Sequence, residues 1–240
     1  MTPMSQRPGI VPATPRLRSV MSESSAAPIK VDVWSDVQCP WCYIGKRRFE
    51  KGVTASGVPV EIEYHSFELA PDTPVDYDGT PVQYLSERKG VSPDQAAQMV
   101  ERVTTLAAAE GLDYDYDHIH QTNTIKAHEL LHYAKERGRQ QEMKEALLKA
   151  YFVDGGHVGR IADLGDLAAT VGFDRDDVIR ALEAGEYTAA VKADVAQAAA
   201  YGIQGVPFYV FDGKYGVSGA QESATFAQVL QQVVSERANA

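Results

Sequence analysis

The sequence has only two cysteines in 240 residues, Cys39 and Cys42. A structural zinc site needs four ligands, and no second C-x-x-C is present to supply them. A disulfide between the two cysteines would close so short a loop that it would constrain the unfolded chain very little. Neither zinc binding nor a mainly structural role therefore explains the pair well.

Long apolar runs and an excess of positive charge are also absent. No apolar stretch approaches the roughly 18 residues that a membrane-spanning helix requires. The formal net charge is −10 and no basic stripe occurs, which argues against nucleic acid or an anionic membrane as a partner. The short run Lys46-Arg47-Arg48 is interpreted as a solvated helix face.

The N-terminal residues 1–28 contain several prolines and serines but no continuous apolar segment of the kind found in secretory signal peptides. This composition predicts a disordered extension, and Met21 is a candidate alternative start. Without an export signal we expect a cytoplasmic protein. In that reducing compartment a C-x-x-C pair is more often catalytic than structural.

The two cysteines flank Pro40 and Trp41 where a predicted strand ends and a predicted helix begins. Cysteine reacts as the thiolate, and the unpaired N–H groups and partial positive charge of a helix N-terminus lower the pKa of a thiol placed there. Pro40 suits the first helical position because its missing N–H would have no helical partner. We therefore predict a redox pair, with Cys39 as the exposed nucleophile and Cys42 as the less accessible resolving thiol.

The periodicity of apolar residues predicts a strand–helix–strand unit, a block of helices and a closing strand–strand–helix unit. Strands are expected at residues 29–35, 60–67, 207–211 and 214–218. Helices are expected at residues 40–54, 92–111, 124–138, 141–154, 163–172, 174–185, 187–201 and 223–235. The prolines and the glycine between residues 71 and 81 predict a loop.

Gly205-Val206-Pro207 precedes the third predicted strand. A proline at the first residue of a strand removes no interior hydrogen bond, and most X–Pro bonds are trans, so the local sequence favours simple strand punctuation. The functional alternative is a cis proline beside the C-x-x-C, which would expose the backbone of Val206 to an extended substrate segment.

Four segments of the chain match one family pattern: S-D-V-Q-C-P-W-C-Y-I-G at 35–45, N-T with A-H within 123–128, G-I-Q-G-V-P at 202–207 and V-S-G-A-Q at 217–221. With the predicted order of elements, they resemble the DsbA-like branch of the thioredoxin superfamily, and within it the cytoplasmic FrnE-type oxidoreductases. The resemblance implies an α/β protein, namely a thioredoxin-like fold with a large α-helical insertion. Residues 29–76 and 186–236 would form the thioredoxin-like domain, and residues 77–185 an inserted helical domain that roofs the active site.

The same resemblance implies the roles of individual residues. Cys39 would be the nucleophile, Cys42 the resolving cysteine and Pro207 a cis proline preceded by Val206. Trp41, Val206 and Pro207 would contact the substrate.

Asn123, Thr124 and His128 would then line the mouth of the site, although capping of the helix near Thr124 explains the first two equally well. The expected partners are protein or small-molecule thiols and disulfides. No metal or other cofactor is expected beyond the redox-active disulfide. The sequence leaves open glutathione as the reductant and a homodimer as the assembly.

Two related families in this branch, the 2-hydroxychromene-2-carboxylate isomerases and the kappa-class glutathione transferases, typically carry serine at the position of Cys39 and bind glutathione. Their late Trp-Gly-x-Asp-Arg-like segment aligns with residues 217–221, where this chain has no Trp, Asp or Arg. The departure favours dithiol chemistry. A glutathione-dependent isomerase or transferase remains the alternative.

His128-Glu129-Leu130-Leu131-His132 matches the H-E-x-x-H pattern of zinc peptidases and lies on a predicted helix. In such a site both histidines bind the metal and the glutamate polarises a water molecule. A third ligand would be needed, and no downstream metzincin pattern follows. The apolar stripe of the helix already explains its sequence, so a zinc peptidase is a remote alternative.

Overall fold

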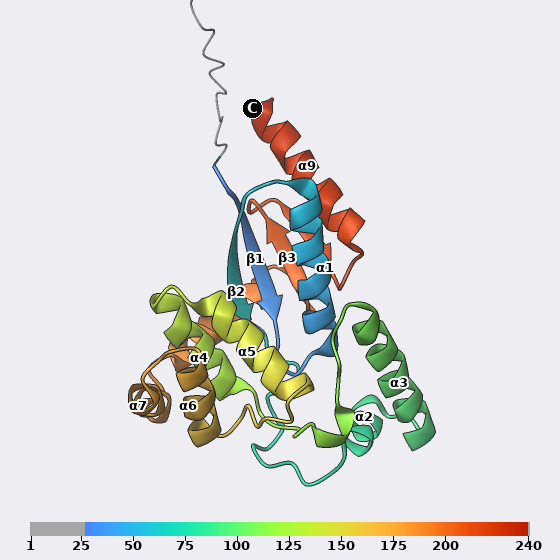
Figure 1. The fold of residues 1–240 in the computed structure, drawn as a ribbon, viewed down its shortest axis with the longest axis vertical. Helices are drawn as coiled ribbons and strands as arrows, with labels where there is room; N and C mark the ends of the chain where they lie inside the picture. The colour runs from blue at the N-terminus through green and yellow to red at the C-terminus, as the bar shows by residue number, and fades with distance from the viewer. Residues whose placement is uncertain (1–26, 240) are drawn as a thin grey trace, which may run out of the picture.

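The computed structural model describes residues 27–239. Residues 1–26 of the predicted disordered extension, with Met21 among them, lie outside the described residues. Within residues 27–239 the strands form one four-stranded sheet in the order β2-β1-β3-β4 (Figure 1). The strands are β1 (Ile29–Ser35), β2 (Val60–Ser66), β3 (Phe208–Phe211) and β4 (Tyr215–Ser218).

The sheet joins the two ends of the described chain. β1 pairs in parallel with β2 and antiparallel with β3, and β3 pairs antiparallel with β4. The turn between β3 and β4 places Asp212 and Gly213 at φ 53° and 66°, as the sequence Asp-Gly favours for a tight hairpin. The thioredoxin-like fold with a helical insertion that the sequence predicts is confirmed.

Alternating side chains of β1 divide the core between the two faces of the sheet. On one face Val31 and Val33 pack with Phe49 and Phe226. On the other face Trp34 packs against Ile203 and against Ala198, which lies in the last turn of α8 (Thr188–Ala200). The helices are α1 (Pro40–Ser56) and α9 (Ser223–Ala238) on the first face and α8 on the second.

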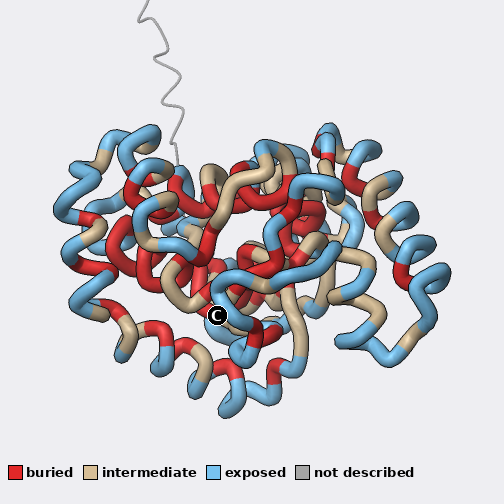
Figure 2. Tube along the Cα trace, turned by 90° about the horizontal axis from the view of Figure 1, so that it is seen from below, coloured by how far each residue is buried: buried red, intermediate tan, exposed pale blue. Residues whose placement is uncertain are grey.

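Between β2 and α8 the chain is helical. Its elements are α2 (Pro81–Lys89), α3 (Pro93–Ala109), a 3-10 turn (Tyr116–His118), α4 (Ile125–Glu136), α5 (Gln140–Phe152), α6 (Ile161–Thr170) and α7 (Arg175–Ala184). β1 points toward these helices, and α1 begins where β1 ends, beside them (Figure 1). Seen from below, buried residues gather on the inner sides of the helices and exposed residues on their outer turns (Figure 2). The predicted limits of the inserted domain, residues 77 and 185, remain a prediction.

Two sequence predictions about this block are wrong. The segment after residue 80 is not only loop, because α2 starts there with Thr80 and Gln83 in a capping box and Pro81 in the first turn. This is the same signal, Ser/Thr-Pro-x-Gln, that correctly marks the start of α3. α6 starts at Ile161, not at Asp163, which lies instead in its first turn.

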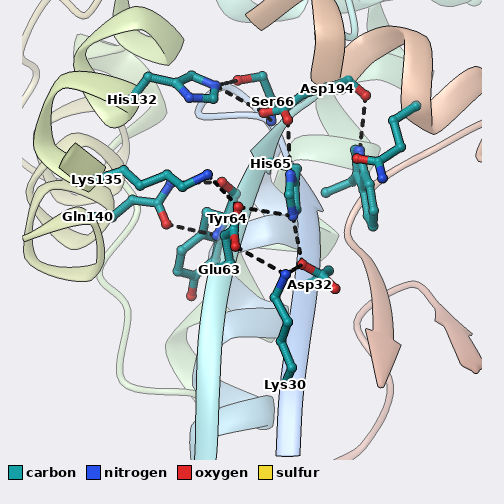
Figure 3. Close-up of polar contacts among 12 residues, drawn as sticks. Lys30, Asp32, Glu63, Tyr64, His65, Ser66, His132, Lys135, Gln140 and Asp194 are labelled. Atoms are coloured by element: carbon teal, nitrogen blue, oxygen red, sulfur yellow. Dashed lines mark hydrogen bonds and ion pairs between the residues drawn. The ribbon is translucent and has the colours of Figure 1, made fainter. Parts of the chain in front are cut away.

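The helices are fixed to the edge strand β2 by buried polar contacts (Figure 3). The Gln140 side chain accepts a hydrogen bond from Tyr64 N at 2.9 Å and donates one to Tyr64 O at 2.7 Å. The Gln140 side chain therefore makes the two hydrogen bonds that a neighbouring strand would make at Tyr64. The backbone N–H and C=O of this edge residue are thus paired. Among the helices of residues 27–239, none combines the length and apolar character needed to cross a bilayer.

Candidate active site

The two cysteines lie at the junction of β1 and α1. Cys39 is the N-cap residue of α1, with extended backbone angles, and Pro40 occupies its first turn. Cys42 N donates to Cys39 O at 3.0 Å, so the helix begins between the two thiols. Both cysteines are free. The geometry is the one that the sequence predicts for a redox pair on a helix N-terminus.

The exposure of the thiols differs from the sequence prediction. Cys39 and Cys42 are equally buried, each with 3% of its surface exposed. Cys39 is covered because the loop before β3 returns to it, and Tyr114 closes the other side by donating from its hydroxyl to Pro40 O at 2.7 Å. Trp41 between them is 38% exposed. The part of the motif that faces solvent is thus the tryptophan.

Val206 and Pro207 lie directly beside Cys39. The Val206–Pro207 peptide bond is cis. The Cys39 thiol donates to Val206 O at 3.5 Å across 167 positions of sequence. Pro207 packs on α1 at Gly45, where an added Cβ would lie 3.0 Å from the proline ring. The preference of the local sequence for a trans bond is therefore wrong, and the structure has the cis bond that the resemblance implies.

The electrostatics of the two thiols also differ from the sequence prediction. Burial opposes ionisation of Cys42, but a hydrogen bond from Cys39, the charge of Lys144 and the Ser35 hydroxyl together lower its pKa. The same hydrogen bond between the thiols, followed by burial, raises the pKa of Cys39. The two thiols therefore influence each other, and in this arrangement Cys42 ionises more readily than Cys39.

Asp36, in the loop between β1 and α1, is fully buried beside the thiols. Burial raises the pKa of this carboxyl, but His128, the backbone N–H of Leu69 and Thr124 outweigh that effect and lower it. Leu69 N donates to Oδ2 at 2.8 Å, and His128 Nε2 lies 3.3 Å from Oδ1. Asp36 is therefore held as a carboxylate, and its negative charge opposes ionisation of Cys39.

Two of the three residues expected at the mouth of the site contact this carboxylate. Thr124 and His128 are buried, and both act on Asp36. Asn123 instead caps α4, because its side chain accepts from Ile125 N at 2.9 Å and donates to Pro71 O at 2.8 Å. The helix-capping explanation fits Asn123, whereas the Thr124 side chain makes no capping hydrogen bond.

The H-E-x-x-H residues turn toward separate partners. His128 Nε2 faces Asp36, whereas His132 Nε2 lies 3.0 Å from Asp194 Oδ2. Glu129 Oε1 accepts from the Lys126 ammonium at 3.0 Å. Within residues 27–239, the side chains close enough to share a metal ion are Asp32, Glu63 and His65, and they include neither histidine of the motif. The geometry therefore gives the zinc peptidase alternative no support.

A mixed sheet of this order, with a C-x-x-C on the first helix and a cis proline before the antiparallel hairpin, defines a thioredoxin-like thiol site. Residues 30–231 match the model of the DSBA-like thioredoxin domain. The chain therefore belongs to the DsbA-like family of thiol–disulfide oxidoreductases.

Individual relatives agree with this family. The chain is 40% identical to the probable DsbA oxidoreductase SCO1869 from Streptomyces coelicolor, with a TM-score of 0.80 over 87% of this chain and 91% of that one. It is 29% identical to the uncharacterized protein YwbO of Bacillus subtilis (strain 168), over 66% of this chain and 74% of that protein.

Two more distant structures share the fold. The cytosolic disulfide reductase DsbM from Pseudomonas aeruginosa is 16% identical, with a TM-score of 0.57 over 85% of this chain and 98% of that one. A 2-hydroxychromene-2-carboxylate isomerase is 14% identical, with a TM-score of 0.66 over 88% and 98%. The predicted branch and its relatives are thus confirmed.

Sequence reasoning missed Lys144. This residue is 1% exposed, and within residues 27–239 its Nζ has no hydrogen-bond partner. A signal was available, since Lys144 precedes Leu147, Leu148 and Tyr151 by three, four and seven positions, on the apolar stripe of its helix. A lysine at such a position is a buried charge that packing alone does not explain.

Proposed function

We propose that the protein is a cytoplasmic thiol–disulfide oxidoreductase of the FrnE type that acts on disulfides of proteins or small molecules. The observation that carries this proposal is the 3.5 Å contact between the Cys39 thiol and Val206 O, next to the cis bond of Pro207. A substrate sulfur that attacks or is attacked at Cys39 would meet the Val206 backbone, which offers a hydrogen-bonding edge to an extended chain.

The chemistry follows from the two thiols. Cys39 gives up its proton, its sulfur attacks the substrate disulfide, and the leaving substrate thiolate takes up a proton. A mixed disulfide forms and the first substrate thiol leaves. The Cys42 sulfur then attacks Cys39, the mixed disulfide breaks and the second substrate thiol is released. The substrate gains two electrons and the protein ends with a Cys39–Cys42 disulfide; the reverse steps oxidise a dithiol.

The surface around the thiols suits an apolar or peptide substrate. Trp41 and Leu69 are large apolar side chains with 38% and 44% of their surface exposed. Trp41 lies between the cysteines, and Leu69 is tied to the active-site loop through Asp36. Glutathione is proposed as the reductant that returns the disulfide to the dithiol, a role that this chemistry allows for any small thiol.

The test is reduction of insulin disulfides by purified protein in the presence of glutathione. We expect turnover by the wild type and none by Cys39→Ser, since Cys39 is the thiol that contacts the Val206 backbone. Cys42→Ser should accumulate mixed disulfides that are visible by mass spectrometry. Turnover that survives both substitutions would overturn the proposal, and turnover of a glutathione adduct by Cys42→Ser alone would indicate the isomerase or transferase alternative.

A further inference from the structure

Lys144 lies in α5 at the junction of the helical block with the thioredoxin-like part. The residues on either side of it are fixed to that part of the chain. Gln140, one turn earlier, pairs with the backbone of Tyr64 in β2. Glu145, the next residue, accepts from Tyr43 Oη at 2.7 Å and from Lys46 Nζ at 2.6 Å in α1. The position of the Lys144 side chain is therefore set from both sides.

The Lys144 ammonium has no ion-pair or hydrogen-bond partner among the described residues. It lies 5.6 Å from the centre of the Tyr64 ring. Burying such a group without a partner is unfavourable, because even a neutral polar group loses its hydrogen bonds to water. The fold nevertheless keeps the Lys144 side chain buried. We therefore expect Lys144 to make a favourable interaction during the reaction that offsets this cost.

The charged groups around Lys144 indicate which interaction offsets the cost of its burial. The groups within its electrostatic reach are Cys42 and Lys46 of α1, and Cys39 and Asp36 of the preceding loop. Asp36 already has Leu69 N and His128 as partners. Of the negative groups, only the sulfur of the cysteine pair gains and loses its charge during the reaction.

We propose that Lys144 is a positioning residue for the resolving step, whose ammonium balances the charge of the Cys42 thiolate. This inference rests on the proposed oxidoreductase function. In the mixed disulfide Cys39 has no proton, so it no longer donates a hydrogen bond to Cys42. Lys144, the Ser35 hydroxyl and the backbone at Asp36 are then left to stabilise the Cys42 thiolate, and Lys144 is the one that carries a positive charge.

The step balances as follows. The Cys42 thiol loses its proton and its sulfur attacks Cys39, while the nearby Lys144 ammonium balances the negative charge of the sulfur. The Cys39–Cys42 bond forms as the bond from Cys39 to the substrate sulfur breaks. The leaving substrate thiolate takes up one proton, which balances the proton that Cys42 lost. Burial favours the amine and lowers the pKa of Lys144, whereas the charge of Cys42 raises it, so oxidation of the pair removes the main reason for Lys144 to be protonated.

Stopped-flow reaction of the reduced protein with one equivalent of dithiobis(nitrobenzoate) separates the two steps. Attack by Cys39 releases the first thionitrobenzoate, and attack by Cys42 on the mixed disulfide releases the second. For Lys144→Met we expect the second release to slow roughly three- to tenfold relative to the first at neutral pH. Raising the pKa of a thiol by about one unit lowers its thiolate fraction tenfold. Part of this loss is offset because a thiolate of higher pKa is a stronger nucleophile. The midpoint of its pH profile should also rise.

The matched control is Lys149→Met, the same change on the exposed side of the same helix. It should leave the ratio of the two rate constants unchanged. A folded Lys144→Met protein with the wild-type ratio and pH midpoint overturns the role of Lys144 alone. If wild-type protein releases no first thionitrobenzoate, the proposed function fails, and this inference fails with it.

A second measurement needs no substitution, in case Lys144→Met does not fold. The ¹³Cε signals of lysines in labelled wild-type protein are titrated in the dithiol and disulfide states. We expect a lysine that titrates at lower pH after oxidation, because the Cys42 charge has gone. Lysine titrations that are identical in both redox states overturn the proposal.

Discussion

Gly45, in the second turn of α1, has no room for a side chain. An added Cβ would lie 2.8 Å from Tyr209 Oη and 3.0 Å from the Pro207 ring. The close approach of these two residues to the helix keeps the cis proline beside the thiols. Glycine is therefore required at this position by contact and not by backbone angles.

We expect Gly45→Ala to lower the free energy of unfolding by about 1–3 kcal/mol, because overpacking forces Pro207 or the helix to move. Urea unfolding measures this change, and the first release of thionitrobenzoate should slow as Val206 leaves Cys39. Gly205→Ala is the control, since no atom lies within 4 Å of a Cβ built there. Equal unfolding midpoints for the two variants would show that the site has room to adjust.

At the scale of elements, the capping and periodicity signals predicted most helices to within a few residues. Gln95 and Ser92 start α3 and Asp174 caps α7, both as expected. α2 was missed because Pro81 was interpreted with its neighbouring prolines as a loop signal, although Thr80 and Gln83 form the same capping box. The local sequence thus contains a helix-start signal, the capping box, and a competing turn signal, the prolines.

The docking of α5 on β2 depends on Gln140, which satisfies both the N–H and the C=O of Tyr64. Gln140→Leu would leave both backbone groups buried without partners, at about 1–3 kcal/mol for each. We therefore expect a loss of about 2–6 kcal/mol in urea unfolding, combined from the two groups. Gln141→Leu, on the exposed side of the same turn, should change stability little. A similar loss in both variants would contradict the contact.

At the scale of the whole molecule, His65 joins the sheet to α8. Its Nδ1 lies 2.9 Å from Asp194 Oδ1, and its Nε2 lies 2.8 Å from Asp32 Oδ1 (Figure 3). Burial opposes protonation of the ring, but the two carboxylates outweigh it and raise the pKa of His65 above its ordinary value of 6.5. Burial opposes ionisation of Asp194, but hydrogen bonds from His132, His65 and Ser66 N outweigh it and lower the pKa of this carboxyl.

The raised pKa of His65 predicts how the free energy of unfolding changes with pH. The contribution of His65 is fully present below its unfolded pKa, near 6.5, and is lost as pH rises through the higher folded pKa. The contribution of Asp194 is present above its ordinary value of 3.8 and is lost as pH falls. We expect His65→Gln to cost most between these limits and less at alkaline pH, measured by urea unfolding as a function of pH.

The exposed His118 provides the control for this profile. It pairs only with Asp115 at the surface, where ion pairs contribute little. His118→Gln should therefore follow the wild-type profile at every pH. If the difference between His65→Gln and wild type does not change with pH, the ring is not protonated in the folded protein.

The sequence by itself determined the local features: a C-x-x-C at a strand-to-helix junction, proline in the first turn, and the caps and stripes of most helices. These follow from contacts within a few residues. Tertiary structure decided which groups meet across long separations, because burial depends on the packing of distant elements. It placed Cys39 against Val206, 167 positions away, and buried both thiols equally. It also brought the Lys144 ammonium within electrostatic reach of Cys42, with no hydrogen-bond partner in the described part of the chain.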